Sequence, residues 1–197
     1  MKHRIIRGFD SSFRRNAGGF AVLLAVAAAL APGAGNTRVG FAASARLQLS
    51  TPAFHAGGFI PSRYTCSGTN TSPSLTWSRP PEGTQSFTLV LTDPDAPAHP
   101  WVHWVVFNLP PRTMTLPEGV PKGPHIQGGG SQGVNDFRFA GYGGPCPPPG
   151  KPHRYFFRLY ALNIRMNLKA DATKPDVERA MKGHVLAEAE LMGRYRR

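Results

Sequence analysis

The feature that most constrains the fold is a series of short apolar runs separated by proline and glycine. The runs are rich in β-branched and aromatic side chains and lie at 47–50, 75–77, 87–91, 102–107 and 155–162. The chain contains 22 Gly and 20 Pro, and many of them lie between these runs, where they favour turns and interrupt helices. Runs of this length and composition are typical of strands. We therefore predict a mainly β fold, either an antiparallel β-sandwich or a partly closed pair of sheets.

The C-terminal part has a different, helical pattern. Thr173 is a candidate N-cap, Pro175 falls in the first turn, and Asp176 completes a spacing like that of a capping box. A short helix is predicted from there to about Gly183. The segment 185–192 is interpreted as a second short helix because its apolar residues recur at helical spacing.

The first 45 residues have the composition of an export signal. An apolar run at 18–30 follows five basic residues, and A-x-A cleavage motifs lie at 29–31 and 43–45. The run is shorter than the roughly 20 residues that a membrane-spanning helix needs, so we expect no transmembrane segment. The residues after Arg14 and Arg15 fit a twin-arginine signal poorly, which favours the general secretory route. We predict a leader at 1–45, cleaved near 31 or 45, one domain at 46–197, and a periplasmic or secreted location.

Net charge argues against a nucleic-acid partner. The formal charge of the whole chain is +12, but the leader carries part of it. From residue 46 onward there are 17 basic and 10 acidic residues, a net charge of +7. Apart from the basic tail at 194–197, these charges are scattered, and no basic stripe alternates with aromatic residues as a nucleic-acid groove requires.

Two cysteines, Cys66 and Cys146, lie outside the leader. In an exported protein an even number of cysteines favours a disulfide. Two free, buried thiols are the alternative that the sequence leaves open. A metal site built from two thiols this far apart is disfavoured.

Two segments about fifty residues apart combine acidic and imidazole groups with rigid proline and glycine backbone. In the first, Asp93 and Asp95 flank a proline at the end of an apolar run, and His103 lies in the next run. In the second, a Gly-Pro segment precedes His153 and Tyr155, which would point to the same face of a strand. If the two segments meet, they form a small polar pocket suited to an anionic group, with backbone N–H groups at Gly143 and Gly144 free to approach it.

These two segments resemble the two signatures of the phosphatidylethanolamine-binding protein family. The first is Leu89-Val90-Leu91-Thr92-Asp93-Pro94-Asp95-Ala96-Pro97 with Trp101-Val102-His103, and the second is the 144–149 run with Pro152-His153-Arg154-Tyr155-Phe156-Phe157. Flanking segments, among them Asn135-Asp136-Phe137, are similar to the bacterial, Raf-kinase-inhibitor-like branch. The resemblance covers almost all of 47–195.

The resemblance implies antiparallel sheets with short helices and a small pocket for phosphate-like or carboxylate anions, including a phospholipid head group. Its implied ligand-binding residues are Asp93, Pro97, Trp101, His103, Gly144, Pro145, His153 and Tyr155. The chain departs from the eukaryotic pattern at Val102, which replaces one histidine of a Trp-His-His triplet, and at Cys146 in the Gly-Pro loop. The C-terminal part also resembles the bacterial branch, which argues against the eukaryotic signalling partners. A homodimer is left open.

The favoured hypothesis is a binding protein without catalysis or cofactor, acting as a modulator or inhibitor of another protein. The alternative is a metal-dependent hydrolase using Asp93, Asp95, His99, His103 and His153. A G-x-S-x-G match at 129–133 lacks the preceding strand and following helix that a nucleophile elbow needs. Protease inhibition, the remaining hypothesis, finds no recognisable reactive loop.

Overall fold

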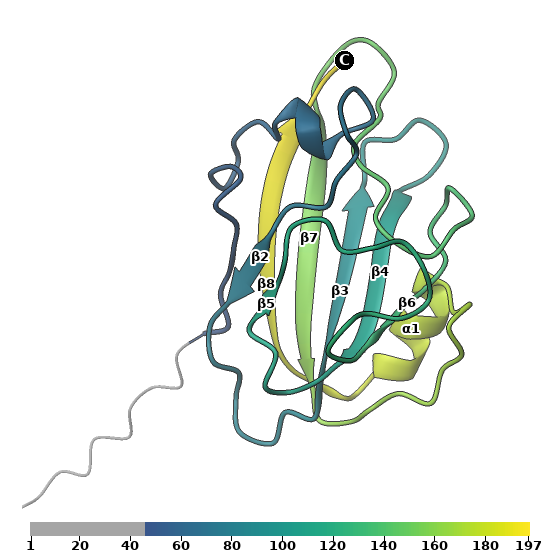
Figure 1. Cartoon of the computed structure of the whole chain (residues 1–197). Coiled ribbons are helices and arrows are strands. Elements are labelled where there is room, and N and C mark those ends of the chain that lie inside the picture. The colour runs from purple at the N-terminus through teal and green to yellow at the C-terminus, as the bar shows by residue number, and fades with distance from the viewer. Residues whose placement is uncertain (1–45) are drawn as a thin grey trace, which may run out of the picture. The chain divides into compact units, whose positions relative to one another are not determined.

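The computed structural model describes residues 46–197, and two antiparallel sheets organise them (Figure 1). The five-stranded sheet has the order β6-β4-β3-β7-β8. Its strands are β6 (Ser131–Gln132), β4 (Trp101–Leu109), β3 (Ser86–Asp93), β7 (His153–Leu162) and β8 (Val185–Tyr195). The smaller sheet has the order β1-β2-β5, with β1 at Leu49–Ser50, β2 at Leu75–Trp77 and β5 at Thr115–Leu116. The predicted antiparallel β class is therefore correct, and each of the five apolar runs contributes to a strand.

The main core lies between the two sheets. Along β7 the side chains alternate, so that Tyr155, Phe157 and Leu159 are fully buried while their neighbours face the other side of the sheet. They pack in one apolar cluster with Leu75 and Trp77 of the smaller sheet. Burial of each large apolar side chain stabilises the fold by about 1.5–3 kcal/mol, so this cluster holds the two sheets together.

A second layer covers the opposite face of the large sheet. The helix α1 (Lys174–Met181) buries Val177 and Met181 against Val105 and Phe107 of β4. Because both faces of the neighbouring β3 are covered, all eight of its residues are buried. One short 3-10 helix, η1 (Ser62–Tyr64), completes the helical structure of the described residues.

The helix predicted after Thr173 is confirmed as α1. The Asp176 carboxylate accepts hydrogen bonds from the backbone N–H and the hydroxyl of Thr173, at 3.0 and 2.6 Å. Pro175 lies in the first turn, where its missing N–H costs nothing.

The second helix predicted at 185–192 is wrong, because this segment belongs to β8. It pairs with β7 along almost its whole length, and Ala189 and Leu191 of its inward face are buried. The alanine, glutamate and leucine residues favour a helix intrinsically, but cross-strand pairing outweighs that weak preference. Gly193 lies within this strand. A Cβ there would lie 2.6 Å from Ile60 and 2.8 Å from Phe54, so glycine lets the 54–60 segment pack on the strand.

The long segment between β5 and β7 is fastened by one buried amide. The side chain of Gln132 donates to the carbonyl groups of Pro121 and Gly123 and accepts a bond from the indole of Trp104 at 2.7 Å. Strand β6 therefore adds to the edge of β4. Ser131, the serine of the G-x-S-x-G match, lies in this short strand with no helix after it, which is not the geometry of a nucleophile elbow.

The end of β3 and the starts of β4 and β7 lie at one end of the large sheet, close to the C-terminus (Figure 1). The predicted leader at 1–45 and its cleavage sites lie outside the described residues. Among the residues described, no helix is long and apolar enough to cross a bilayer.

Candidate functional site

The two motif segments meet at this end of the sheet and enclose a pocket of about 200 Å³. Its wall consists of Asp93, Ala96, Pro97, Trp101, His103, Phe137, Cys146, Pro147, Pro148 and His153. Five of the eight residues predicted to bind a ligand therefore line one cavity: Asp93, Pro97, Trp101, His103 and His153. The other three, Gly144, Pro145 and Tyr155, are not among the lining residues.

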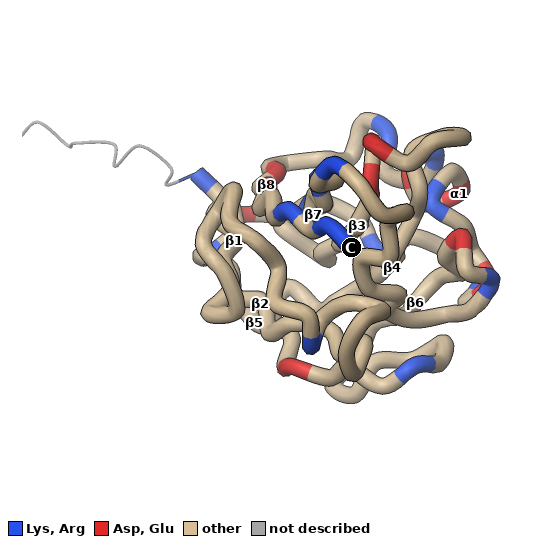
Figure 2. The backbone as a smooth tube through the Cα atoms, turned by 90° about the horizontal axis from the view of Figure 1, so that it is seen from above, with Lys and Arg blue, Asp and Glu red and all other residues tan. Residues whose placement is uncertain are grey.

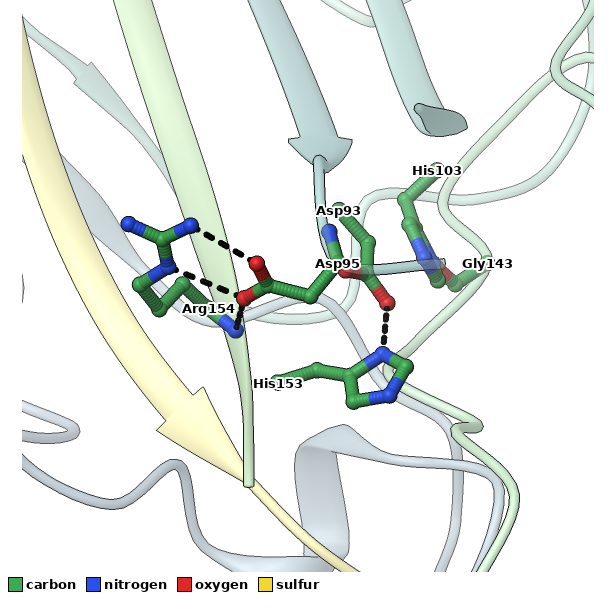
Figure 3. A network of polar contacts seen from close by, with 6 residues as sticks. All are labelled: Asp93, Asp95, His103, Gly143, His153 and Arg154. Carbon is green, nitrogen blue, oxygen red and sulfur yellow. Dashed lines mark hydrogen bonds and ion pairs between the residues drawn. The ribbon is translucent and has the colours of Figure 1, made fainter. Parts of the chain in front are cut away.

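The base of the pocket holds an acid–imidazole pair. The Nδ1 of His153 lies 2.8 Å from Oδ2 of Asp93, and the two side chains are 12% and 5% exposed (Figure 3). The other carboxylate oxygen of Asp93 accepts the backbone N–H of Asp95 at 2.8 Å. Because the carboxylate only accepts, Nδ1 carries a proton and Nε2 of His153 is left without a protein partner among the described residues.

A second aspartate fastens the turn that follows the first. The carboxylate of Asp95 accepts bonds from Nε and Nη2 of Arg154 at 2.9 and 2.7 Å, and from the Arg154 backbone N–H at 2.9 Å (Figure 3). The bonds from Arg154 are the largest cause that lowers the pKa of Asp95 below its usual range. Asp95 thus joins the end of β3 to the start of β7, next to His153.

His103 is a buried, neutral imidazole. Only 2% of the residue is exposed, and its Nδ1 lies 2.7 Å from the carbonyl oxygen of Gly143. Burial lowers the pKa of His103, although the Gly143 carbonyl and the charge of Asp93 oppose this shift. Two imidazoles in one pocket would suggest two donors for an anion, but the donor proton of His103 is already used by the backbone.

The predicted backbone donors are also engaged. The N–H of Gly143 donates to the carbonyl of His103 at 2.9 Å, and the N–H of Gly144 donates to Oδ1 of Asn70 at 2.7 Å. A Cβ at Gly144 would lie 2.5 Å from the carbonyl oxygen of Tyr64. Glycine is needed there for close packing between loops, and neither N–H is free for a ligand.

Tyr155 supports the pocket from the core. The residue is fully buried, and its ring packs edge-on against His103 with a centroid distance of 5.3 Å. Burial, and then the charge of Asp93, raise the pKa of the Tyr155 hydroxyl well above its usual range. That hydroxyl is close enough to feel the Asp93 charge, yet it has no hydrogen-bond partner of acceptable geometry among the described residues and is sealed from solvent.

Cys66 and Cys146 form a disulfide, which resolves the alternative left open by the sequence. The bond joins the loop after η1 to the pocket wall, since Cys146 is one of the lining residues. The backbone N–H of Cys66 also donates to the carbonyl of Pro145 at 3.0 Å, so Pro145 helps to hold the two loops together.

Sequence reasoning missed Phe137 as a wall residue. Its ring packs edge-on against Trp101 and His103, with centroid distances of 5.5 and 5.3 Å, and 37% of the residue is exposed. The neighbouring Asp136 accepts the N–H of Val102 at 2.7 Å, which fixes this loop beside β4. The sequence offered one indication of Phe137, an aromatic residue in a polar loop, but the residues that it contacts are distant in sequence. Ala96, Pro147 and Pro148 were likewise not singled out.

The five residues proposed for a metal-dependent hydrolase do not form a ligand set. Asp95 is bound to Arg154, and the ring of His99 stacks on Trp101 at 5.6 Å. Among residues 46–197, no three His, Cys, Asp or Glu side chains are grouped to hold a metal ion. A larger, open depression of about 570 Å³ lies between β1, β2 and β8, and Glu190 is the one ionisable side chain in its wall. Of these two cavities, the smaller one therefore has the larger set of ionisable side chains in its wall.

Comparison with known proteins agrees with this architecture. Residues 50–196 match the family described as Phosphatidylethanolamine-binding protein. The chain is 52% identical over 151 residues to a UPF0098 protein of Methanothermobacter thermautotrophicus, covering 77% of this chain and 99% of that one. It is 44% identical over 164 residues to a UPF0098 protein of Aquifex aeolicus, covering 82% and 95%.

Two solved structures are similar in fold and sequence. CT736 of Chlamydia trachomatis, a homologue of phosphatidylethanolamine-binding proteins, superposes with a TM-score of 0.71 at 39% identity, over 77% of this chain and 98% of that one. YbcL of E. coli, described as a member of the mammalian PEBP family, gives 0.71 at 36% identity, over 78% and 99%. With the matching signatures, sheets and pocket, the chain belongs to the phosphatidylethanolamine-binding protein family.

Proposed function

We propose that this protein is a binding protein without catalytic activity, which captures a small phosphate-like anion in the pocket around Asp93 and His153. The observation that carries the proposal is the acid–imidazole pair at the base of a cavity of about 200 Å³. A cavity of this volume suits one small head group rather than a drug-sized ligand.

The charge of the pocket supports an anion once His153 is protonated. The negative charge of Asp93 and the positive charge of His153 then cancel, and Nε2 of His153 offers a charge-assisted hydrogen bond to the ligand. One basic residue of the C-terminal tail lies at the wall: Arg197 reaches to 3.9 Å from Cys146, and Arg194 and Arg196 precede it in the sequence. Figure 2, which looks down on this end of the molecule, shows basic residues beside the C-terminus. Such a field raises the local concentration of anions.

The apolar part of the wall supports a ligand that is more than a bare ion. Trp101, Phe137 and the prolines of the wall provide surface against which a carbon substituent can pack. A phosphorylated small molecule or a phospholipid head group has both a charged phosphate and a carbon substituent. Export, a periplasmic or secreted location and a role as modulator of another protein complete the proposal, and the leader composition supports the first two.

Isothermal titration calorimetry with inorganic phosphate tests the pocket. We expect binding to the wild-type protein and at least tenfold weaker binding to His153→Ala, because the charge-assisted bond is lost. His55→Ala is the matched control, since His55 is exposed and is not one of the lining residues. Equal affinity in all three proteins would reject the assigned pocket.

A further inference from the structure

Two side chains of the pocket wall, Asp93 and His103, offer hydrogen-bond acceptors. Both oxygens of Asp93 accept one bond each, from Asp95 and from His153, and each oxygen keeps further lone-pair capacity. Asp93 is one of the residues that line the cavity, which puts this acceptor in its wall.

His103 contributes a second acceptor. A carbonyl oxygen only accepts, so the contact with Gly143 places the ring proton on Nδ1, and in the neutral ring Nε2 carries a lone pair. Nε2 has no partner among the described residues, and it is not one of their polar atoms that are sealed from solvent. Because the Nδ1 edge faces Gly143, the accessible edge of the ring that lines the cavity is the one with Nε2.

Side-chain donors, in contrast, are scarce. The indole N–H of Trp101 and the hydroxyl of Tyr155 are both sealed from solvent, so a ligand in the cavity does not reach them. Three wall residues, Pro97, Pro147 and Pro148, have no backbone N–H. Among the lining side chains this leaves Nε2 of His153, when protonated, to donate to an anion.

We infer that the pocket selects an oxyanion that still carries a proton, inorganic phosphate or a phosphate monoester, over oxyanions without one, such as sulfate or a phosphodiester. The P–O–H group donates to Asp93 or to Nε2 of His103, while a charged oxygen accepts from His153. Sulfate or a diester has no proton to donate. Its oxygen lone pairs and negative charge would face the acceptors of Asp93 and His103 without forming a hydrogen bond to them. This inference rests on the proposed function and narrows its ligand class to phosphate and its monoesters, so that an intact phospholipid, whose phosphate is a diester, is disfavoured.

Calorimetry with four small probes at about pH 6, near the second pKa of a phosphate ester, tests the selectivity. Inorganic phosphate and methyl phosphate carry the proton, whereas sulfate and dimethyl phosphate do not. We expect each protonated probe to bind at least tenfold more tightly than either unprotonated one. The ratio of methyl phosphate to inorganic phosphate affinity then shows whether the pocket prefers an ester or the free ion.

Asp93→Asn tests whether the Asp93 carboxylate itself sets the selectivity, because a purely structural role would leave the phosphate-to-sulfate affinity ratio unchanged. The amide of the new side chain can donate, so phosphate should lose affinity while sulfate gains, and the phosphate-to-sulfate ratio should fall at least tenfold. Asp136→Asn is the matched control: it removes an equal charge near the pocket, Asp136 is not a lining residue, and an amide oxygen can still accept the Val102 N–H. Its ratio should equal that of the wild type.

The outcomes separate the two proposals. If all four probes bind the wild type equally well, the pocket binds anions but the selectivity is wrong. The selectivity is equally wrong if Asp93→Asn, with an unchanged circular dichroism spectrum, keeps the wild-type ratio. If none of the probes binds, the proposed function itself fails, and the selectivity fails with it.

Discussion

Asp93 and His153 are sixty residues apart in the chain and 2.8 Å apart in the fold. Asp93 ends β3 and His153 begins β7, and these strands are antiparallel neighbours in the large sheet. Their juxtaposition therefore follows from the sheet register and does not depend on a mobile loop. A site placed on strand ends in this way is held more rigidly than one built on loops alone.

The Asp95–Arg154 pair should matter for ligand binding more than for stability. The two side chains are 28% and 52% exposed, and pairs this exposed contribute up to about 1 kcal/mol to the free energy of unfolding. Asp95→Asn should lower that free energy by less than about 1 kcal/mol. It should weaken phosphate binding several-fold, because the turn whose Asp95 N–H orients the Asp93 carboxylate loses its attachment to β7. Urea unfolding and calorimetry measure the two effects.

Glu190→Gln is the control for this prediction. It removes another exposed ion pair of β7, the one between Arg158 and Glu190, at a distance from the pocket. Phosphate affinity should not change in this variant. If Glu190→Gln loses as much phosphate affinity as Asp95→Asn, the Asp95–Arg154 pair has no specific role in ligand binding.

Acidification should destabilise the protein through His103. Burial lowers its folded-state pKa below the ordinary value of 6.5, so the unfolded chain binds the proton more strongly. The stability that results is fully present above about pH 6.5 and is lost as the pH falls towards the folded-state pKa. Urea unfolding at about pH 7.5 and about pH 5 should show this loss in the wild type and a smaller one in His103→Gln. His55→Gln should keep the wild-type slope; if His103→Gln keeps it too, the assignment is incorrect.

Loss of the Cys66–Cys146 disulfide should destabilise the fold and loosen the pocket wall. The bond closes a loop with a sequence separation of 80, and removal of such a bond typically lowers the free energy of unfolding by about 2–5 kcal/mol. The double variant Cys66→Ser/Cys146→Ser should show this loss in urea unfolding, together with weaker phosphate binding. Dithiothreitol should have the same effect on the wild type and none on the double variant. Unchanged stability of the double variant would contradict the prediction.

Much of the fold could be predicted because strand signals are local. The apolar runs and their turns correctly indicated β1, β2, β3, β4 and β7, and the caps at Thr173 and Asp176 indicated α1. Strand β8 was mistaken for a helix because Ala, Glu and Leu have helical preferences, while the partner that makes 185–195 a strand lies in β7. That information resides in the pairing of distant segments and not in the segment itself.

The candidate site, too, could be predicted only in part from the sequence. The residue types of Asp93, His103 and His153 predicted a shared pocket, and the fold brings them together. Their donor and acceptor roles could not be predicted, because these depend on backbone partners such as Gly143 and Asn70, which only the folded loops supply. Phe137 was missed for the same reason, since its contacts with Trp101 and His103 cross more than thirty positions of sequence.

The most direct test of the anion site is an imidazole ¹H–¹⁵N NMR spectrum recorded while inorganic phosphate is added. We predict that the Nε2 resonance of His153 shifts in a saturable way, that His103 responds at Nε2 while Nδ1 keeps its proton, and that the exposed His55 does not change. Saturable shifts confined to histidines outside the pocket, with His153 unaffected, would contradict the claim that Asp93 and His153 form the anion site.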